Sequence, residues 1–325
     1  MKILLVRPWV NKKITTVKNF MCGEPLGLEC VSAVLKELGH DVLLADFMIE
    51  TKGRLLPYLE EFRPDAVGIT SQCTDVENVL AIAGQTKEFD PMIAVFVGGV
   101  QATCFPDSFF KGDVDYVFKS TTRANMKQLM EEIETRKETA AAGTPSRPPV
   151  IIEGIYAKSH DFQNDGEFCY NEYIVPDRQC TARYRSTYQY TGFQPCAVIQ
   201  TAYGCRNRCL FCIRWKLEGA ALREVDIDEI VTQIEALDEP YLMICDNDFL
   251  INEVRLERFC DLLERRNIRK KYMCYGSVNS ILEKPHLFER LAKNGLMAVI
   301  IGYESFSDKQ LAAYRKAATV DDNIK

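Results

Sequence analysis

The feature that most constrains the fold of this chain is a regular alternation of short β-rich runs with helical runs. In residues 1–140 the helical runs place apolar side chains at three- and four-residue spacing, as in Leu28, Val31 and Leu35. Strands that alternate with helices form a parallel sheet covered by helices. The sequence therefore predicts a five-stranded, parallel, doubly wound α/β domain of the flavodoxin or Rossmann type, with strands at Lys2–Arg7, Asp41–Ala45, Ala66–Thr70, Ile93–Val97 and Tyr116–Phe118.

The alternation stops near residue 140 and resumes at Ala197. Residues 138–149 are rich in Ala, Thr and Pro, which is typical of a linker, and the following residues show little periodicity. We therefore expect a first domain over residues 1–140, a linker or connector over 141–195, and a partial (β/α) barrel over 196–325. The barrel's expected strands are Ala197–Thr201, Tyr241–Cys245, Tyr272–Tyr275 and Met297–Gly302, and its expected helices are Ile227–Leu237, Glu253–Arg265, Pro285–Asn294 and Asp308–Arg315.

Composition excludes several classes of protein. Hydrophobic residues make up 47% and charged residues 26% of the chain, which is the balance of a folded protein with a sizeable core. The net charge of -6 argues against a nucleic-acid partner. No apolar run approaches the ~18 residues of a transmembrane helix, and Met1–Arg7 is predicted to be a strand rather than a signal peptide. The odd number of cysteines, 13, argues against a secreted disulfide framework, so we expect a cytoplasmic protein.

Three of the cysteines form a tight cluster directly after the first strand of the second series. Cys205, Cys209 and Cys212 have the spacing CxxxCxxC, so that three thiolates can converge from one loop. An iron-sulfur cube usually takes four thiolates, and three would leave one iron with an open coordination position. The alternative is a structural zinc site that takes Cys196 or Cys245 as a fourth ligand. Zinc sites more often show two separated CxxC pairs or His ligands, which this chain supplies poorly.

At this motif the chain resembles the radical S-adenosylmethionine superfamily, whose CxxxCxxC follows the first strand of a partial (β/α)6 barrel and often has an aromatic residue, here Phe211, before the last cysteine. The resemblance implies that the three cysteines hold a [4Fe-4S] cluster whose open iron binds S-adenosylmethionine. Reductive cleavage would then yield a 5′-deoxyadenosyl radical, for which an external one-electron reductant is required. The family barrel has six βα units, so we expect that this chain, with four, is C-terminally truncated.

Two further segments look like cofactor contacts of that family. Asp246, at the end of the second strand, resembles an acidic residue near the cofactor's amino group, and Glu304 and Ser305 resemble a segment that borders its ribose. The alternative is structural, because Asp246 and Asp248 could cap the next helix and Glu304 could form a buried ion pair. Beyond the cluster ligands, no catalytic side chain is assigned.

The first domain resembles the cobalamin-binding domain that precedes the barrel in one large subgroup of the superfamily. The resemblance rests on Pro25–Leu28, Gly39–Val42 with Asp46, Ser71, and Val97–Thr103, and it implies corrinoid contacts at Ser71, Gly98, Gly99, Gln101 and Thr103. A Gly-Gly turn at a strand end lets the backbone approach a flat macrocycle closely. The Asp-x-His-x-x-Gly motif is absent, so cobalt would be bound without that histidine. Where many relatives carry Gly-Glu-Gly-Glu, this chain has Lys119-Ser120-Thr121-Thr122.

The leading hypothesis is a cobalamin-dependent radical S-adenosylmethionine methyltransferase that acts on an unactivated carbon. A second hypothesis keeps the radical chemistry without cobalamin, for a cyclisation or an oxidative rearrangement. A third is a metal-stabilised binding module without turnover. The sequence does not choose among a small-molecule, lipid or peptide substrate.

Overall fold

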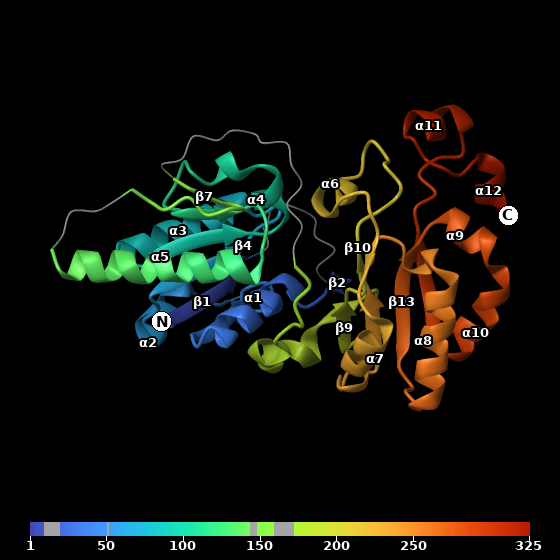
Figure 1. The fold of residues 1–325 in the computed structure, drawn as a ribbon, viewed down its shortest axis with the longest axis horizontal. Coiled ribbons are helices and arrows are strands. Elements are labelled where there is room, and N and C mark those ends of the chain that lie inside the picture. The colour runs from blue at the N-terminus through green and yellow to red at the C-terminus, as the bar shows by residue number, and fades with distance from the viewer. Residues whose placement is uncertain (10–19, 51, 144–147, 159–171) are drawn as a thin grey trace. The chain divides into compact units, whose positions relative to one another are not determined.

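The computed structural model describes residues 1–9, 20–50, 52–143, 148–158 and 172–325. The chain divides into two compact units. Unit 1 comprises Met1–Asn19 and Pro25–Tyr184, and unit 2 comprises Phe20–Glu24 and Arg185–Lys325. Parts of the expected linker, residues 144–147 and 159–171, lie outside the described residues. Each unit contains its own parallel sheet (Figure 1).

Unit 1 is built on a six-stranded sheet with the order β3-β1-β4-β5-β6-β7. The first five strands are parallel, and numbered along the chain they have the order 2-1-3-4-5 of a flavodoxin-like sheet, which confirms the expected fold class. The sixth strand, β7, pairs with β6 in the antiparallel direction and was not predicted, because three residues are too few to show a period. The strands are β1 Lys2–Arg7, β3 Asp41–Asp46, β4 Ala66–Thr70, β5 Ala94–Gly98, β6 Tyr116–Phe118 and β7 Ile155–Ala157.

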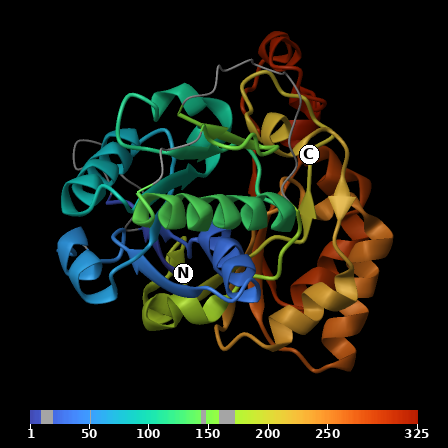
Figure 2. The same cartoon turned by 60° about the vertical axis from the view of Figure 1, so that its left-hand side comes forward.

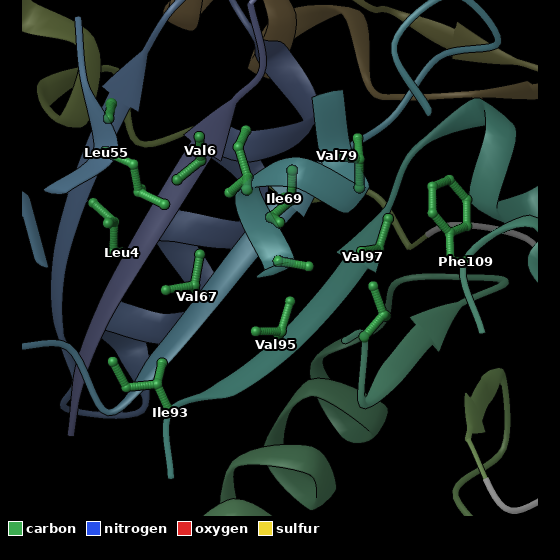
Figure 3. Close-up of a cluster of buried hydrophobic side chains, with 14 of the residues drawn as sticks. Leu4, Val6, Leu55, Val67, Ile69, Val79, Ile93, Val95, Val97 and Phe109 are labelled. Carbon is green, nitrogen blue, oxygen red and sulfur yellow. The ribbon is translucent and has the colours of Figure 1, made fainter. Parts of the chain in front are cut away.

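Helices cover both faces of this sheet. On one face α1 and α5 are neighbours, with α5 lying across the front of the unit in Figure 2. On the other face α2 and α3 pack over a core that includes Leu4, Val67 and Val95, which Figure 3 shows projecting from adjacent strands. Burial of this apolar surface is the main stabilising term of such a unit. The helices are α1 Leu26–Glu37, α2 Leu55–Phe62, α3 Val76–Phe89, α4 Val100–Cys104, α5 Arg123–Ala141 and the short 3-10 turn η2 Pro106–Ser108.

Unit 2 contains a four-stranded parallel sheet in the sequential order β14-β13-β12-β9, as expected for an open (β/α) barrel. Leu242 and Tyr272 face the helices, where Phe259 packs against them, whereas Met243 and Met273 line the opposite, inner face. The strands are β9 Cys196–Ile199, β12 Tyr241–Ile244, β13 Lys271–Gly276 and β14 Leu296–Ile301. The helices are α6 Arg214–Glu218, α7 Ile227–Glu235, α8 Glu253–Arg265, α9 Val278–Glu283, α10 Phe288–Lys293, α11 Asp308–Ala313 and α12 Val320–Ile324, with 3-10 turns η4 Phe249–Ile251 and η5 Pro285–Leu287.

A segment from far upstream in the chain completes unit 2. Strand β2 (Met21–Cys22) pairs with β8 (Gln189–Tyr190), which follows the 3-10 segment η3 (Arg178–Thr187). Beside it, the Glu24 carboxylate accepts a hydrogen bond from the Val198 backbone N–H on the open edge of β9. The segment therefore covers backbone groups that an edge strand would otherwise expose. Among the described helices none is both long and apolar enough to cross a membrane.

Candidate functional site

The cysteine loop of unit 2, residues 204–213, begins where β9 ends. Strand β10 (Ala202–Tyr203) leads into it and pairs with β11 (Arg223–Glu224), which closes the loop at its base. The loop lies at the carboxyl end of the parallel strands, where βα folds place their chemistry. Helix α6 follows the last cysteine and lies at the same end of unit 2 as α11 (Figure 1).

The three thiols of this loop are close enough to influence one another. Burial raises the pKa of Cys205, a hydrogen bond from the Asn207 backbone lowers it, and the neighbouring Cys212 and Cys209 raise it further. The backbone N–H of Cys212 donates to the Cys209 carbonyl at 3.1 Å, and the Trp215 indole donates to the same oxygen at 3.0 Å. The described residues contain no group of three His, Cys, Asp or Glu side chains placed to hold one metal ion.

Gly204 sets the direction in which the loop leaves β10. Its φ of 90° lies in the left-handed region, and a Cβ there would collide with the carbonyl oxygen of Ala221. The next residue, Cys205, donates its backbone N–H to the Gly219 carbonyl at 3.1 Å. A side chain at residue 204 would therefore displace the first cysteine of the motif.

An amide side chain after β12, Asn247, and the Glu218 carboxylate together hold the two backbone polar groups of Gly204, and sequence reasoning missed both. Asn247 donates to the Gly204 carbonyl at 2.9 Å and to the Glu218 carboxylate at 2.7 Å. Glu218 in turn accepts the Gly204 N–H at 3.1 Å, and Arg214 donates to the Asn247 side-chain oxygen at 2.7 Å. Because these partners are more than ten residues apart in the sequence, no local pattern indicates the network.

Asp246 is buried and holds the residues that precede the loop. Its side chain is 1% exposed and accepts the backbone N–H groups of Thr201 at 2.6 Å and Ala202 at 3.1 Å, in addition to the Thr201 hydroxyl. Burial nevertheless raises its pKa to about 6. Asp248, by contrast, caps η4 by accepting the Leu250 N–H, so the structural alternative is confirmed for that residue.

The segment after β14 lies beside the second cysteine. Glu304, at a left-handed φ of 64°, is 4.0 Å from the Lys316 ammonium, which donates to the Gly302 carbonyl at 2.8 Å. Burial raises the pKa of Cys209, whereas Lys316 lowers it and Glu304 raises it. Lys316 is a second residue that sequence reasoning missed, because a single lysine after a helix carries no motif.

Two other expected contacts in this region adopt defined positions. Ser305 donates its hydroxyl to the Gln310 side chain at 2.5 Å and accepts the Ser307 N–H. Phe211 is half exposed and forms an edge-to-face contact with Tyr314 at 5.6 Å between ring centres. The Leu210 N–H also donates to the Tyr314 carbonyl, which ties the cysteine loop to the end of α11.

In unit 1 the residues expected to contact a corrinoid gather at the carboxyl ends of β4 and β5. Ser71 is fully buried, donates to the Gly98 carbonyl at 2.7 Å and accepts the Ala102 N–H at 3.2 Å. Gly99 has a φ of 97°, and a Cβ there would lie 2.6 Å from the Ser71 carbonyl oxygen. Ser71 and Gly99 therefore shape the turn, and residues 98–99 present bare backbone.

The remaining two expected contacts flank this turn. Gln101 donates its backbone N–H to the Ser71 carbonyl and its side chain to Ser108 at 3.4 Å. The Thr103 hydroxyl lies 3.2 Å from both the Gly99 and the Lys119 carbonyl oxygens. The segment Lys119–Thr122 leads into α5, for which Thr122 forms a capping box with Asn125.

The comparisons with known proteins match one segment in each part of the chain. Residues 12–136 match the B12 binding domain family, and residues 199–325 match the Radical SAM superfamily. The chain therefore carries a B12-binding domain followed by a radical SAM domain. A B12-binding domain implies cobalamin, and a radical SAM domain implies a [4Fe-4S] cluster and S-adenosylmethionine.

The chain spans about 55–61% of the length of the curated relatives described next. It is 26% identical over 329 residues to the hopanoid C-3 methylase of Methylococcus capsulatus, an alignment that covers 100% of this chain and 61% of the relative. It is 24% identical over 327 residues to the anaerobic magnesium-protoporphyrin IX monomethyl ester cyclase of Rubrivivax gelatinosus, covering 92% and 55%. The structure of apo, selenomethionine-labelled OxsB, a cobalamin-dependent S-adenosylmethionine radical enzyme, matches with a TM-score of 0.66 and 18% identity over 99% of this chain and 46% of that one, which shows the fold.

The residues present fit these cofactors. Three neighbouring thiols on one loop suit a cluster with one open iron. Burial raises the pKa of Cys205 and Cys209, which favours neutral thiols at these two residues unless a positively charged metal replaces the protons. The bare backbone at Gly98 and Gly99 suits a flat macrocycle. The His40 ring nitrogen Nδ1 lies 3.2 Å from the amino group of Met1, at the amino ends of the strands. His40 therefore lies away from the turn at Gly98 and Gly99, which follows the carboxyl end of β5.

Proposed function

We propose that this chain is the core of a cobalamin-dependent radical SAM methyltransferase that acts on an unactivated carbon. In this proposal residues 1–140 bind cobalamin, residues 196–325 form the radical SAM barrel, and residues 141–195 connect them. Cys205, Cys209 and Cys212 hold the cluster. The methylase named among the relatives supports the reaction type, and the chain spans 61% of its length.

The observation that carries the proposal is the cysteine loop itself. The loop that carries the three neighbouring thiols starts at Gly204, where a side chain would collide with the backbone. This loop lies at the carboxyl end of a parallel sheet, within the segment that matches the radical SAM superfamily. When bound, the cluster and S-adenosylmethionine supply a carbon-centred radical by one-electron cleavage, and cobalamin supplies a methyl group.

The chain's own residues position these groups. Asp246 and Asn247 fix the residues that start the loop, which keeps the thiols in register. Glu304 and Lys316 place one negative and one positive charge beside Cys209, where Glu304 would border the ribose of S-adenosylmethionine and Lys316 would attract its carboxylate group. The other residues proposed to contact S-adenosylmethionine are Phe211, Asp246 and Ser305. Ser71, Gly98, Gly99, Gln101 and Thr103 form the proposed corrinoid contact.

Anaerobic reconstitution with iron and sulfide tests the central assignment. The reconstituted protein should bind about four irons, the count of one cube, and form 5′-deoxyadenosine when S-adenosylmethionine and dithionite are added. The triple variant C205A/C209A/C212A should lose both the iron and the product. Undiminished cleavage by the triple variant, or one zinc in place of iron, would refute the proposal.

A second candidate is a cyclisation or an oxidative rearrangement without cobalamin, and the name of the Rubrivivax gelatinosus relative, a cyclase, favours the cyclisation. Products separate the two candidates, because methyl transfer adds one carbon to the substrate and cyclisation or rearrangement adds none. Isotope labelling of the S-adenosylmethionine methyl group gives the answer, since only a methyltransferase moves the label into product.

We also propose a cytoplasmic location. All twelve cysteines in the described part of the chain are free thiols, as a reducing compartment would keep them.

A further inference from the structure

The surface around the cysteine loop has a charge opposite to that of the whole protein. The chain carries a net charge of -6, yet residues 205–217 contain four basic side chains and no acidic one. Arg206 and Arg208 lie between the first two cysteines, and both are exposed. Within the described residues neither arginine has an ion-pair partner, unlike Arg214, which pairs with Glu218. Two free guanidinium groups therefore project from the loop that holds the thiols.

Neighbouring elements extend this surface. Lys216 on α6 is exposed, and Arg315 is exposed immediately after Tyr314, whose carbonyl accepts the Leu210 N–H at 3.0 Å. An apolar side chain, Leu210, follows Arg206 and Arg208 in the loop and is 54% exposed. We call this surface the cysteine-loop patch and define it as Arg206, Arg208, Leu210, Lys216 and Arg315.

Arginine side chains are enriched at protein interfaces, and exposed apolar groups ringed by charge mark interaction sites. On the adjoining segment, Glu304 forms an ion pair with Lys316 at 4.0 Å. The patch is therefore positive overall, and a partner that complements it must be acidic. Like charges across an interface are strongly unfavourable, so an acidic partner would also be selected over a basic one.

We propose that the cysteine-loop patch is the docking surface for an acidic one-electron carrier protein. The inference rests on the proposed function, because a radical SAM cluster must gain one electron before each cleavage. The carrier would lose one electron and the cluster would gain it, with no bond formed or broken at the surface. Arg206 and Arg208 flank the cluster ligands in the sequence, so docking there gives the electron a short path. Redox encounters use small interfaces and rely on charge for their association rate.

Calorimetric titration with an acidic flavodoxin, kept oxidised so that no turnover occurs, measures docking directly. The double charge reversal R206E/R208E should weaken binding at least tenfold at low salt, a loss of roughly 1.4 kcal/mol or more. Raising the salt concentration should weaken wild-type binding steeply and variant binding little. The matched control is R269E/K271E, which makes the same charge change at the amino end of β13, where both side chains are exposed. The control should change the affinity by less than about twofold.

Two further measurements guard against a damaged loop. The milder variant R206Q/R208Q should bind flavodoxin with intermediate affinity, and every variant compared should hold as much iron as the wild type. With dithionite, a small reductant that does not dock, R206E/R208E should lose far less of its 5′-deoxyadenosine formation, relative to the wild type, than it loses with reduced flavodoxin.

The two proposals fail separately. If R206E/R208E binds flavodoxin as tightly as the wild type, or if R269E/K271E weakens binding equally, the docking inference is overturned. Binding of the wild type to anionic phospholipid vesicles but not to flavodoxin would overturn it as well. If the wild type cleaves no S-adenosylmethionine even with dithionite, the proposed function fails whatever the titration shows.

Discussion

The carboxylate of Asp246 accepts the backbone N–H of Thr201 at 2.6 Å and so joins the end of β12 to the residues that follow β9. Arg255 donates to the Thr201 carbonyl at 3.0 Å from the other side. Both backbone groups of Thr201 are thus held by side chains from later βα units. The position of the backbone just before the cysteine loop is therefore fixed by side chains that lie outside the loop.

Replacing this carboxylate by an amide gives a prediction with a defined pH dependence. Burial raises the pKa of Asp246 to about 6, above its ordinary value of 3.8. Between these values the folded state binds more protons than the unfolded state, so the contribution of Asp246 to stability is full below pH 3.8 and is lost as pH rises through about 6. Relative to D246N, the wild type should therefore lose stability from about pH 4 to about pH 6 and change little above. Urea unfolding at several pH values measures the difference, and parallel curves would contradict the assignment.

Gly204→Ala should damage the cluster site without general unfolding. The substitution has two unfavourable effects. A non-glycine residue at this left-handed φ is strained by on the order of 1–3 kcal/mol, and its Cβ collides with the Ala221 carbonyl. We expect iron content after reconstitution to fall severalfold. The control is Gly192→Ala in the same unit, which has a φ of 84° but no atom within 4 Å of the new Cβ. Equal iron loss in both variants would show that strain alone, and not the collision at the loop, is responsible.

The sequence predicts the individual strands and motifs of this site but not the contacts between residues that are far apart in the chain. The parallel strands of both sheets were predicted because runs such as Ile3–Val6 are rich in β-branched and leucine residues. Strands β2, β7 and β8 have two or three residues and no period, so nothing in the sequence indicates them. The hydrogen bond from Asn247 to Gly204 joins the residues after β12 and β10, which come together only in the folded protein. Glu24 is another such case, because no local pattern assigns it to the second unit.

Lys316→Met should make the cluster harder to reduce. The ammonium lies near Cys209, and a nearby cation favours the reduced cluster because that state carries one more negative charge. We expect the reduction potential to fall by roughly 40 mV, which corresponds to about 1 kcal/mol for one electron. A spectroscopic redox titration measures this shift. Lys316→Arg keeps the charge and should restore most of the potential, so an equal shift in both variants would contradict an electrostatic role.

Gly99→Ala should weaken cobalamin binding by the first unit. A Cβ at this position would lie 2.6 Å from the Ser71 carbonyl, so the turn after β5 must move. We expect at least a tenfold loss of affinity, or about 1.4 kcal/mol, in titrations followed by visible absorption. Gly39→Ala is the control, because Gly39 also has a positive φ, 83°, but no atom within 4 Å of the new Cβ. Unchanged binding by G99A would place the corrinoid elsewhere.

Arg185→Met should destabilise the second unit far more than a surface charge deletion does. The guanidinium bridges Glu24 at 2.6 Å and Glu239 at 2.5 Å, whose side chains are 0% and 5% exposed. Removing one partner of a buried ionic cluster leaves uncompensated charge, at a cost of about 3–5 kcal/mol. Arg266→Met removes a more exposed pair with Glu235 and should cost less than about 1 kcal/mol. Calorimetric unfolding of both variants decides the matter. A small loss for R185M would mean that the segment before α1 is held by β2 pairing and by the Glu24 bond to Val198 rather than by the arginine, because those contacts alone would survive the substitution.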